Sequence, residues 1–312
     1  MRILTTIAAI FAAAPVLACI HVPKDYAGSA EQGGQEAILL YNDGREHLIL
    51  KNDFRIEPGA GGQLPSHLAW VIPVPAVPDD YAVEDVEIFR SMFDAWQAWE
   101  KSLRNGQGAK GEDAVPRGGI ELLDKVSVGE YEIQPIRASG TEGARALGEW
   151  LVANGFGEIP AENMAWYVER GWVWLAVDVR PGQGESTLVR NGSLRPLRIS
   201  FASEAIVYPV LFSRGQGVFD ISLYVVTEDA IPDVQAKVAA FGFELEGVAE
   251  FALPEPLQAV QDRASKEGTW KPIETAVITK IAGRRIGGET NPLSRWTQDF
   301  RISLAAAGSK ER

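Results

Sequence analysis

The fold begins with residues 36–56, which read EAILLYNDGREHLILKNDFRI. Two apolar, strand-forming runs, residues 36–41 and 46–56, flank the turn sequence Asn42-Asp43-Gly44. Asn, Asp and Gly tolerate a positive φ, which the tight turns of β-hairpins require. The sequence therefore predicts a β-hairpin here. A third strand is predicted over residues 68–74, where it runs into a proline-rich connector.

Residues 83–104 carry the clearest helical pattern. Apolar side chains recur there at helical spacing, at Val86, Phe89, Phe93, Trp96 and Leu103. We expect Asp79 or Asp80 to cap this helix, and acidic residues in its first turn to complement the helix dipole. A divalent cation site is the alternative use of the same acidic group, which comprises Asp79, Asp80, Glu84, Asp85 and Glu87.

A second hairpin and two further helices are predicted next. The sequence predicts two strands, over residues 120–128 and 131–138, that turn at Gly129. Ser139 and Glu142 have the spacing of a capping box, which predicts a helix over residues 141–154. A short helix follows, opened by Pro160 and ending near Arg170. Residues 172–179 are apolar on both faces, which indicates a central strand that is covered on both sides.

The remaining strand and helix signals complete an α+β fold with mostly antiparallel sheets built from hairpins and a few packed helices. Strands are predicted over residues 195–201, 205–212, 219–227, 274–281 and 299–304, and one helix over residues 257–266. One domain is expected over residues 36–304. The glycine-rich residues 105–119 are a candidate sub-boundary within it, and residues 305–312 are expected to fray.

The N-terminus has the pattern of an export signal. Arg2 precedes an uncharged, mostly apolar run that ends in small residues at Ala18, so residues 1–18 are predicted to be a signal peptide. Cys19 follows directly, and residues 16–19 (VLAC) resemble a bacterial lipobox, in which the cysteine is lipidated. Ordinary cleavage beside an incidental cysteine is the alternative. Residues 19–35 are expected to form a flexible tether.

Composition excludes several classes of protein. The net charge of −12 argues against nucleic-acid binding, which needs a basic stripe. One cysteine and three histidines make a disulfide framework or a multi-histidine metal centre unfavourable, so no metal or cofactor is predicted. The motifs of zinc proteases, nucleophile elbows and dinucleotide-binding turns do not occur. We expect His47 and His67 to be ordinary surface or half-buried histidines.

Tryptophan is the most suggestive residue type, with nine in the chain. Exposed tryptophan faces can stack on sugars, and tryptophan is frequent in binding sites. Core packing is the alternative, and the doubly apolar strand at 172–179 favours it. If the chain has a binding surface, we expect it at Trp166, Trp172 and Trp174, with Glu169 and Arg170 beside them. No catalytic residue is predicted.

Residues 36–50 (EAILLYNDGREHLIL) resemble the opening of DUF2330, a bacterial family of unknown function. Other segments continue the resemblance in order: AWVIPVP (69–75), VGEYEI (128–133), GEWLVANG (148–155), YVERGWV (167–173), LRPLRISF (194–201) and IVYP (206–209). The resemblance implies an exported protein of the bacterial envelope, in the periplasm or on the outer membrane. It implies no activity and supplies no catalytic residues.

Three hypotheses about function follow. The first is a non-catalytic envelope protein, anchored through Cys19, that binds a ligand or a protein partner. The second is a periplasmic hydrolase acting on cell-wall or carbohydrate material with paired carboxylates, whose separation the sequence does not show. The third is a structural module without a small ligand.

Overall fold

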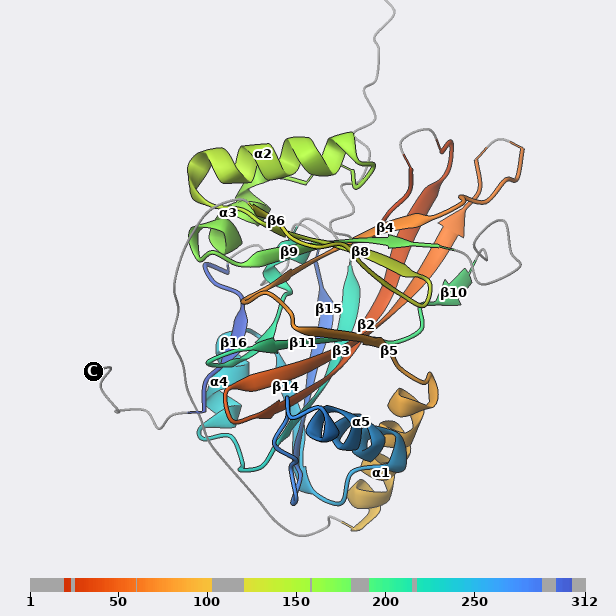
Figure 1. The fold of residues 1–312 in the computed structure, drawn as a ribbon. Helices are drawn as coiled ribbons and strands as arrows, with labels where there is room; N and C mark the ends of the chain where they lie inside the picture. The colour runs from red at the N-terminus through yellow and green to blue at the C-terminus, as the bar shows by residue number, and fades with distance from the viewer. Residues whose placement is uncertain are drawn as a thin grey trace, which may run out of the picture.

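A computed structural model describes residues 20–23, 26–59, 61–102, 121–157, 159–180, 191–214, 218–287 and 296–304. The predicted signal peptide, Cys19, the loop at 105–119 and the tail at 305–312 lie outside the described residues. Two sheets and the helices on their outer sides make up the body of the molecule (Figure 1). The predicted α+β class is confirmed, because only one pair of neighbouring strands is parallel.

The larger sheet has eight strands and contains the predicted hairpin. Its order is β14-β15-β13-β2-β3-β11-β5, with β10 beside β3. The strands are β2 (Ser29–Asn42), β3 (Arg45–Glu57), β5 (Asp80–Val83), β10 (Asn191–Ser193), β11 (Leu197–Ala202), β13 (Phe219–Thr227), β14 (Glu244–Glu250) and β15 (Val277–Ile286). Asp43 and Gly44 both have positive φ, so the turn between β2 and β3 is the one that the sequence predicts.

The smaller sheet has six antiparallel strands, in the order β1-β4-β9-β8-β6 with β7 beside β8. Its strands are β1 (Ile20–His21), β4 (Leu68–Val74), β6 (Glu121–Leu122), β7 (Val126–Val128), β8 (Tyr131–Arg137) and β9 (Val173–Val179). β9 lies between β4 and β8, and only Asp178 along it is not buried, which confirms the predicted central strand. A third, two-stranded sheet pairs β12 (Ile206–Tyr208) with β16 (Phe300–Ile302).

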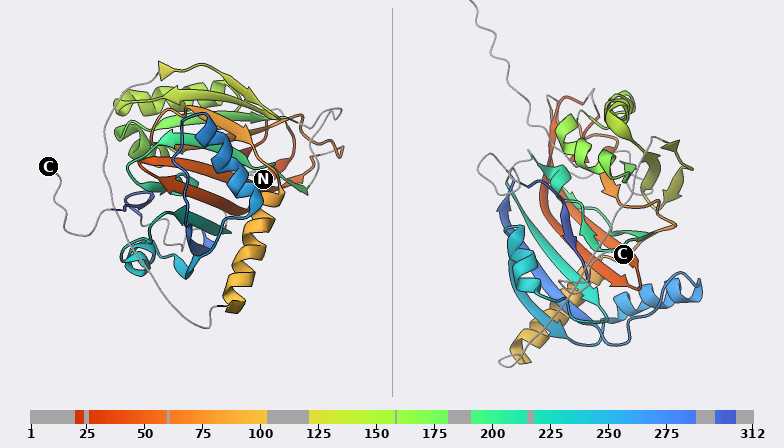
Figure 2. Two further views of the ribbon diagram at one scale, coloured as in Figure 1. Left: turned by 60° about the horizontal axis from the view of Figure 1, so that its bottom comes forward. Right: turned by 90° about the vertical axis from the view of Figure 1, so that its left-hand side faces the viewer.

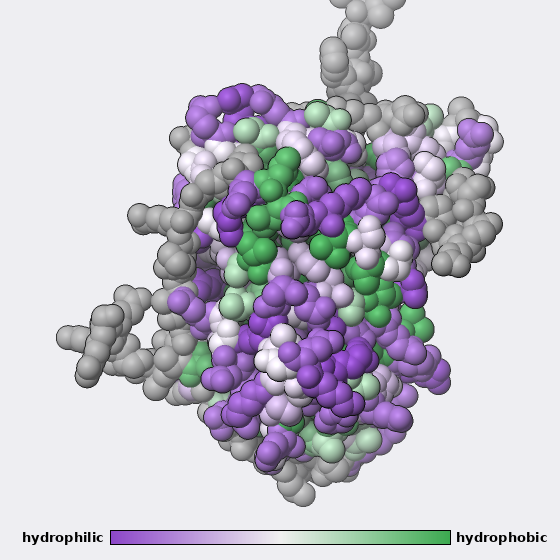
Figure 3. Space-filling view, viewed as in Figure 1, coloured by the Kyte–Doolittle hydropathy of each residue, from purple (hydrophilic) through white to green (hydrophobic). Residues whose placement is uncertain are grey.

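The helices lie on opposite sides of the molecule, as Figures 1 and 2 show. α2 (Gly140–Ala153) and α3 (Ala161–Glu169) lie beside the six-stranded sheet, whereas α1 (Glu87–Ser102) and α5 (Glu255–Lys266) lie against the eight-stranded one. α4 (Val234–Ala240) contacts β14, and a short 3₁₀ turn, η1 (Leu211–Ser213), contacts α3. The face drawn in Figure 3 is largely hydrophilic over α1 and α5, and hydrophobic residues gather above them.

Strand β2 shows how the core is divided. Its side chains alternate, so Ala37 and Leu39 face a large cluster between the two sheets, while Ile38 and Leu40 face a second cluster under α1 and α5. All four side chains are completely buried. Burial on both faces is what holds this strand at the centre of its sheet.

Several boundaries differ from the sequence predictions. Residues 29–35, expected in the tether, are the first half of β2 and pair with β3 and β13. The first helix begins at Glu87 and not at residue 83, because residues 80–83 pair with β11 as β5. Ser139 precedes α2 in extended conformation but makes no side-chain cap bond. Glu142, its expected partner in a capping box, instead bonds to Arg145.

One buried carboxyl joins the third sheet to the core. Asp299 is completely buried, and its Oδ1 accepts hydrogen bonds from the backbone N–H groups of Val210 (2.9 Å), Leu211 (2.9 Å) and Phe300 (2.8 Å). Burial raises the pKa of Asp299 to about 7, and these hydrogen bonds oppose the rise. Because the pKa in the folded state is above its ordinary value, the group stabilises the fold most at low pH.

Replacing Asp299 by Asn should therefore change the pH dependence of stability. The wild type loses stability as pH rises from about 4 through about 7, where Asp299 ionises in the folded state. The asparagine keeps the acceptor oxygen and does not titrate. We expect the difference in the free energy of unfolding, D299N minus wild type, to increase by about 1.4 kcal/mol for each pH unit in this window. Urea unfolding at pH 4 to 8 measures the difference, and parallel curves would contradict the assignment.

Candidate functional site

The largest opening among the described cavities lies between α2 and α3. Leu147 and Leu151 turn one face of α2 into the core, where both are completely buried. Gly148 lies on the side of α2 that faces α3: a Cβ built there would meet Met164 Cε at 3.2 Å. The small residue allows the two helices to approach at this point, and the space on either side stays open.

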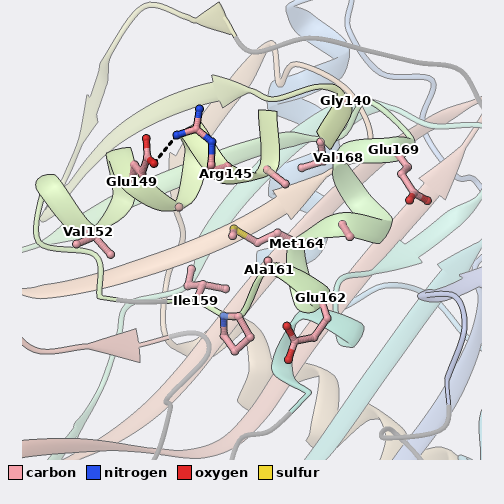
Figure 4. Close-up of a pocket in the computed structure, with 14 residues that line it drawn as sticks. Gly140, Arg145, Glu149, Val152, Ile159, Ala161, Glu162, Met164, Val168 and Glu169 are labelled. Carbon is pink, nitrogen blue, oxygen red and sulfur yellow. Dashed lines mark hydrogen bonds and ion pairs between the residues drawn. The ribbon is translucent and has the colours of Figure 1, made fainter. Parts of the chain in front are cut away.

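This opening is a groove of about 920 Å³, and we call it the α2–α3 groove. Figure 4 shows Val152, Ile159 and Met164 between the two helices. The apolar residues of the groove are Ala144, Val152, Ile159, Pro160, Ala161, Met164, Ala165 and Val168. A concave, mostly apolar site of this size is within the range of ligand pockets.

Charged side chains surround the apolar part of the groove. They are Arg145, Glu149, Glu162 and Glu169. The guanidinium of Arg145 donates to Glu149 Oε1 at 2.5 Å and to Glu142 Oε2 at 2.7 Å, so two carboxylates already neutralise it. The hydrogen bonds that Arg145 donates to both carboxylates raise its pKa. The edge of the groove is therefore acidic.

The three tryptophans of the predicted surface do not offer exposed faces. Trp166, Trp172 and Trp174 are 8%, 3% and 0% exposed. They belong to an aromatic cluster with Tyr167 and Phe212 in which the rings meet mostly edge to face, for example Trp174 and Phe212 with centroids 5.3 Å apart. Such packing is typical of a core. The structure therefore places these rings inside the protein, where they cannot serve as an open stacking platform.

Arg170 and Glu169 remain accessible. Arg170 lies over the ring of Trp166, with 4.3 Å from its Cζ to the ring centroid, and donates to the carbonyl of Trp166 at 3.0 Å. Glu169 belongs to the edge of the α2–α3 groove. Arg170 and Trp172 line a second, smaller pocket on another side of α3. The predicted set is thus divided between the core and two cavities.

A buried serine–histidine pair has the separation of a nucleophile and its base. Ser200 Oγ lies 2.7 Å from His47 Nδ1, and Arg198 donates to the same Oγ at 2.6 Å. Burial lowers the pKa of His47 to about 3, aided by the positive charges of Arg198 and Arg45, so the ring is neutral. Both side chains are 0% exposed, so no substrate reaches Ser200 from solvent. His47 is accordingly not the surface or half-buried residue expected from the sequence.

The acidic group before α1 forms ion pairs, and only Asp85 caps the helix. Asp79 pairs with Arg45. Asp80 and the buried Glu84 pair with Arg198 at 2.5 and 2.8 Å, whereas Asp85 accepts the N–H of Glu87 at 2.8 Å. The expectation that Asp79 or Asp80 caps the helix is therefore wrong. In the part of the chain that the structure describes, no group of three or more His, Cys, Asp or Glu residues is placed to hold a metal ion.

The comparisons with known proteins place the chain in a family. The profile of a family described as "Uncharacterized protein conserved in bacteria (DUF2330)" matches residues 18–252. The chain belongs to this family. DUF2330 thus covers β1 to β14 and includes both walls of the α2–α3 groove. No curated protein matches the sequence.

Among solved structures, the crystal structure of baculovirus P35 is similar to this DUF2330 chain. The TM-score is 0.44 at 10% sequence identity, over 89% of this chain and 98% of that one. A likeness at this level carries no conclusion about function. Within the described residues, no helix has both the length and the hydropathy of a membrane span.

Both helices of the groove are predictable from the sequence, whereas the groove between them is not. A signal was available in the small and short apolar residues at four-residue spacing, Ala144, Gly148 and Val152 on α2 and Ala161 and Ala165 on α3. Residues four apart lie on the same side of a helix, so these small residues form a shallow strip on each one. The pairing of the two strips depends on the loop between the helices and on the sheet below.

Proposed function

We propose that this envelope protein acts by binding and not by catalysis, and that the α2–α3 groove receives a basic amphipathic helix of a protein partner. The observation that carries the proposal is the combination of an apolar floor and an acidic edge in one open groove. Amphipathic helices bind such grooves through apolar anchors on one face, spaced three, four and seven residues apart.

The dimensions of the groove fit this occupant. Its α2 wall runs from Gly140 to Val152, which is about 18 Å at the rise of an α-helix. That length accommodates about three turns of a partner helix and therefore about three anchoring side chains. The floor presents Ala, Gly and Val on α2, which leaves room for large anchors such as Leu or Phe.

The charge of the edge selects the partner. Three carboxylates and one guanidinium surround the floor, and the guanidinium of Arg145 is held by Glu142 and Glu149. Glu162 and Glu169 supply the remaining negative charge. Lysine or arginine on the flanks of the partner helix would complement it. Because these pairs are exposed, they should contribute mainly to specificity and association rate, and salt should weaken them.

The test uses a fluorescent helical peptide with leucine on one face and lysine on the other. We expect the wild type to bind it, and A144D with V152D to weaken binding at least tenfold, because two carboxylates then enter the apolar floor. A98D on the exposed side of α1 is the matched control and should bind like the wild type. An acidic version of the peptide should bind more weakly.

Fluorescence polarisation at low and high salt measures both effects. Circular dichroism and thermal unfolding of each variant verify that the fold is intact. Equal binding by the wild type and the groove variant, or no preference for the basic peptide, would contradict the proposal.

We further propose that residues 1–18 direct export and that a lipid on Cys19 anchors the protein to a membrane of the envelope. Strand β1 begins at Ile20, where it pairs with Trp70 of β4. Because the first strand follows Cys19 directly, the anchor would hold the six-stranded sheet close to the membrane surface, with no long tether between them.

Intact mass of the mature protein from fractionated cells tests this anchor. We expect a diacylated N-terminal cysteine in the membrane fraction, and C19S should appear as an unmodified chain outside that fraction. An unmodified Cys19 in the wild type would contradict the proposed anchor and leave the groove proposal unaffected.

A further inference from the structure

A second cavity lies where the end of α3 meets the third sheet. Its volume is about 300 Å³. It is lined by Pro75 and Ala76 after β4, by Arg170 and Trp172 after α3, by Glu204 after β11, and by Val207 and Arg301 of the third sheet. Segments distant in sequence thus build one small pocket, and we call it the two-arginine pocket.

Two guanidinium groups share this pocket. Arg170 is held in place by the ring of Trp166 below it and by the carbonyl of Trp166, which accepts its Nη1 at 3.0 Å. Arg301 comes from β16, opposite Val207. Both side chains line the same small pocket, and burial together with the positive charge of Arg301 lowers the pKa of Arg170. Glu169, which raises this pKa, is 3.7 Å from Arg170 and largely exposed.

Apolar residues complete the lining of the pocket, namely Pro75, Ala76, Trp172 and Val207. Trp172 and Val207 are 3% and 1% exposed, so their positions are set by the core. Pro75 and Ala76 are half-buried and remain within reach of a ligand. A ligand in this space would meet two guanidinium groups and a short apolar surface.

We propose that the two-arginine pocket binds a small organic monocarboxylate, with its carboxylate at Arg170 and Arg301 and its apolar body against Pro75 and Ala76. Guanidinium groups match the planar carboxylate through paired N–H donors. The volume suits a body of a few carbon atoms. Glu204, exposed at the pocket, disfavours a second negative charge and so selects against dicarboxylates and phosphate esters.

Isothermal titration calorimetry of the full chain with 3-methylbutanoate tests the proposal. We expect binding by the wild type, and at least tenfold weaker binding by R170Q and by R301Q. R90Q is the matched control, because Arg90 is 72% exposed on α1 and does not line the pocket. It should bind like the wild type.

A second measurement does not depend on any variant. The neutral isostere 3-methylbutanamide should not bind, and inorganic phosphate should bind at least tenfold more weakly than the carboxylate. Binding of the amide equal to that of the carboxylate would overturn the role of the arginines. Stronger binding of phosphate would overturn the assignment to a monocarboxylate, and no heat with any carboxylate at millimolar concentration would overturn the site.

Discussion

Replacement of Arg198 by Met is expected to lower the free energy of unfolding by about 3–5 kcal/mol. Arg198 is 3% exposed, and its guanidinium bonds to Glu84, Asp80 and Ser200 at 2.8, 2.5 and 2.6 Å. Glu84 is itself only 6% exposed. Without Arg198 its charge stays buried with Arg263 as its remaining ion-pair partner among the described residues, and Arg263 is half-exposed.

Urea unfolding of R198M and of the double variant R198M/E84Q measures this effect. Removal of the buried carboxylate charge in the double variant should recover part of the lost stability. R90M is the control for loss of an arginine, because Arg90 forms exposed pairs with Glu87 at 3.6 Å and with Asp94 at 3.9 Å. We expect a change below about 1 kcal/mol there. An R198M protein as stable as R90M would show that the network contributes nothing to stability.

Replacement of Trp174 by Ala is expected to cost about 3–5 kcal/mol. Trp174 is completely buried on β9, and its ring lies 5.4 Å from that of Tyr167 and 5.3 Å from that of Phe212. These rings connect the six-stranded sheet to α3 and η1. Truncation would leave a cavity that the rigid neighbours on α3 and η1 cannot fill.

W174F separates packing from other roles, since it retains most of the ring volume and should cost much less than W174A. Trp99, which is half-buried on α1, is the control for loss of a less enclosed tryptophan. Thermal and urea unfolding report the differences. If W174A kept its stability and lost ligand binding instead, the core position assigned to Trp174 would be wrong.

The hairpins were predictable because their signals are local. Asp43 and Gly44 carry the positive φ values of the first turn, and Gly129 that of the second. The period of apolar residues likewise predicted α2, α5 and the covered strand β9. In each case neighbours within a few residues decide the conformation, so a single sequence is sufficient.

Where the structure differs from the sequence prediction, the cause is pairing with segments that are distant in the chain, which overrides the local sequence signal. Residues 29–35 have the composition of a tether but pair with β3 and with β13, and β13 lies almost two hundred residues further along. Residues 80–83 could begin a helix, yet β11 recruits them as β5. The short helix α4 and the strand β14 were not predicted at all, because seven residues carry too weak a period.

The candidate sites likewise combine local features that the sequence predicts with contacts between distant segments that it does not. The sequence alone indicated helices at the positions of α2 and α3, and it singled out Arg170 and Trp172, which line the two-arginine pocket. The doubly apolar strand also favoured core packing of Trp174, but it could not indicate which elements cover each face of β9. Only the packed chain brings Arg301 and Arg170 into one pocket, or places Glu84 against Arg198.

Local conformation in this protein follows from the residues themselves, because turn geometry and apolar period act over a few positions. The pairing of β2 with β13, the groove between α2 and α3 and the buried ion network depend on the tertiary structure. Each of these three features joins residues that are far apart in the chain. The sequence permits several pairings of such residues, and the burial of apolar surface and of charge in the assembled core decides between them.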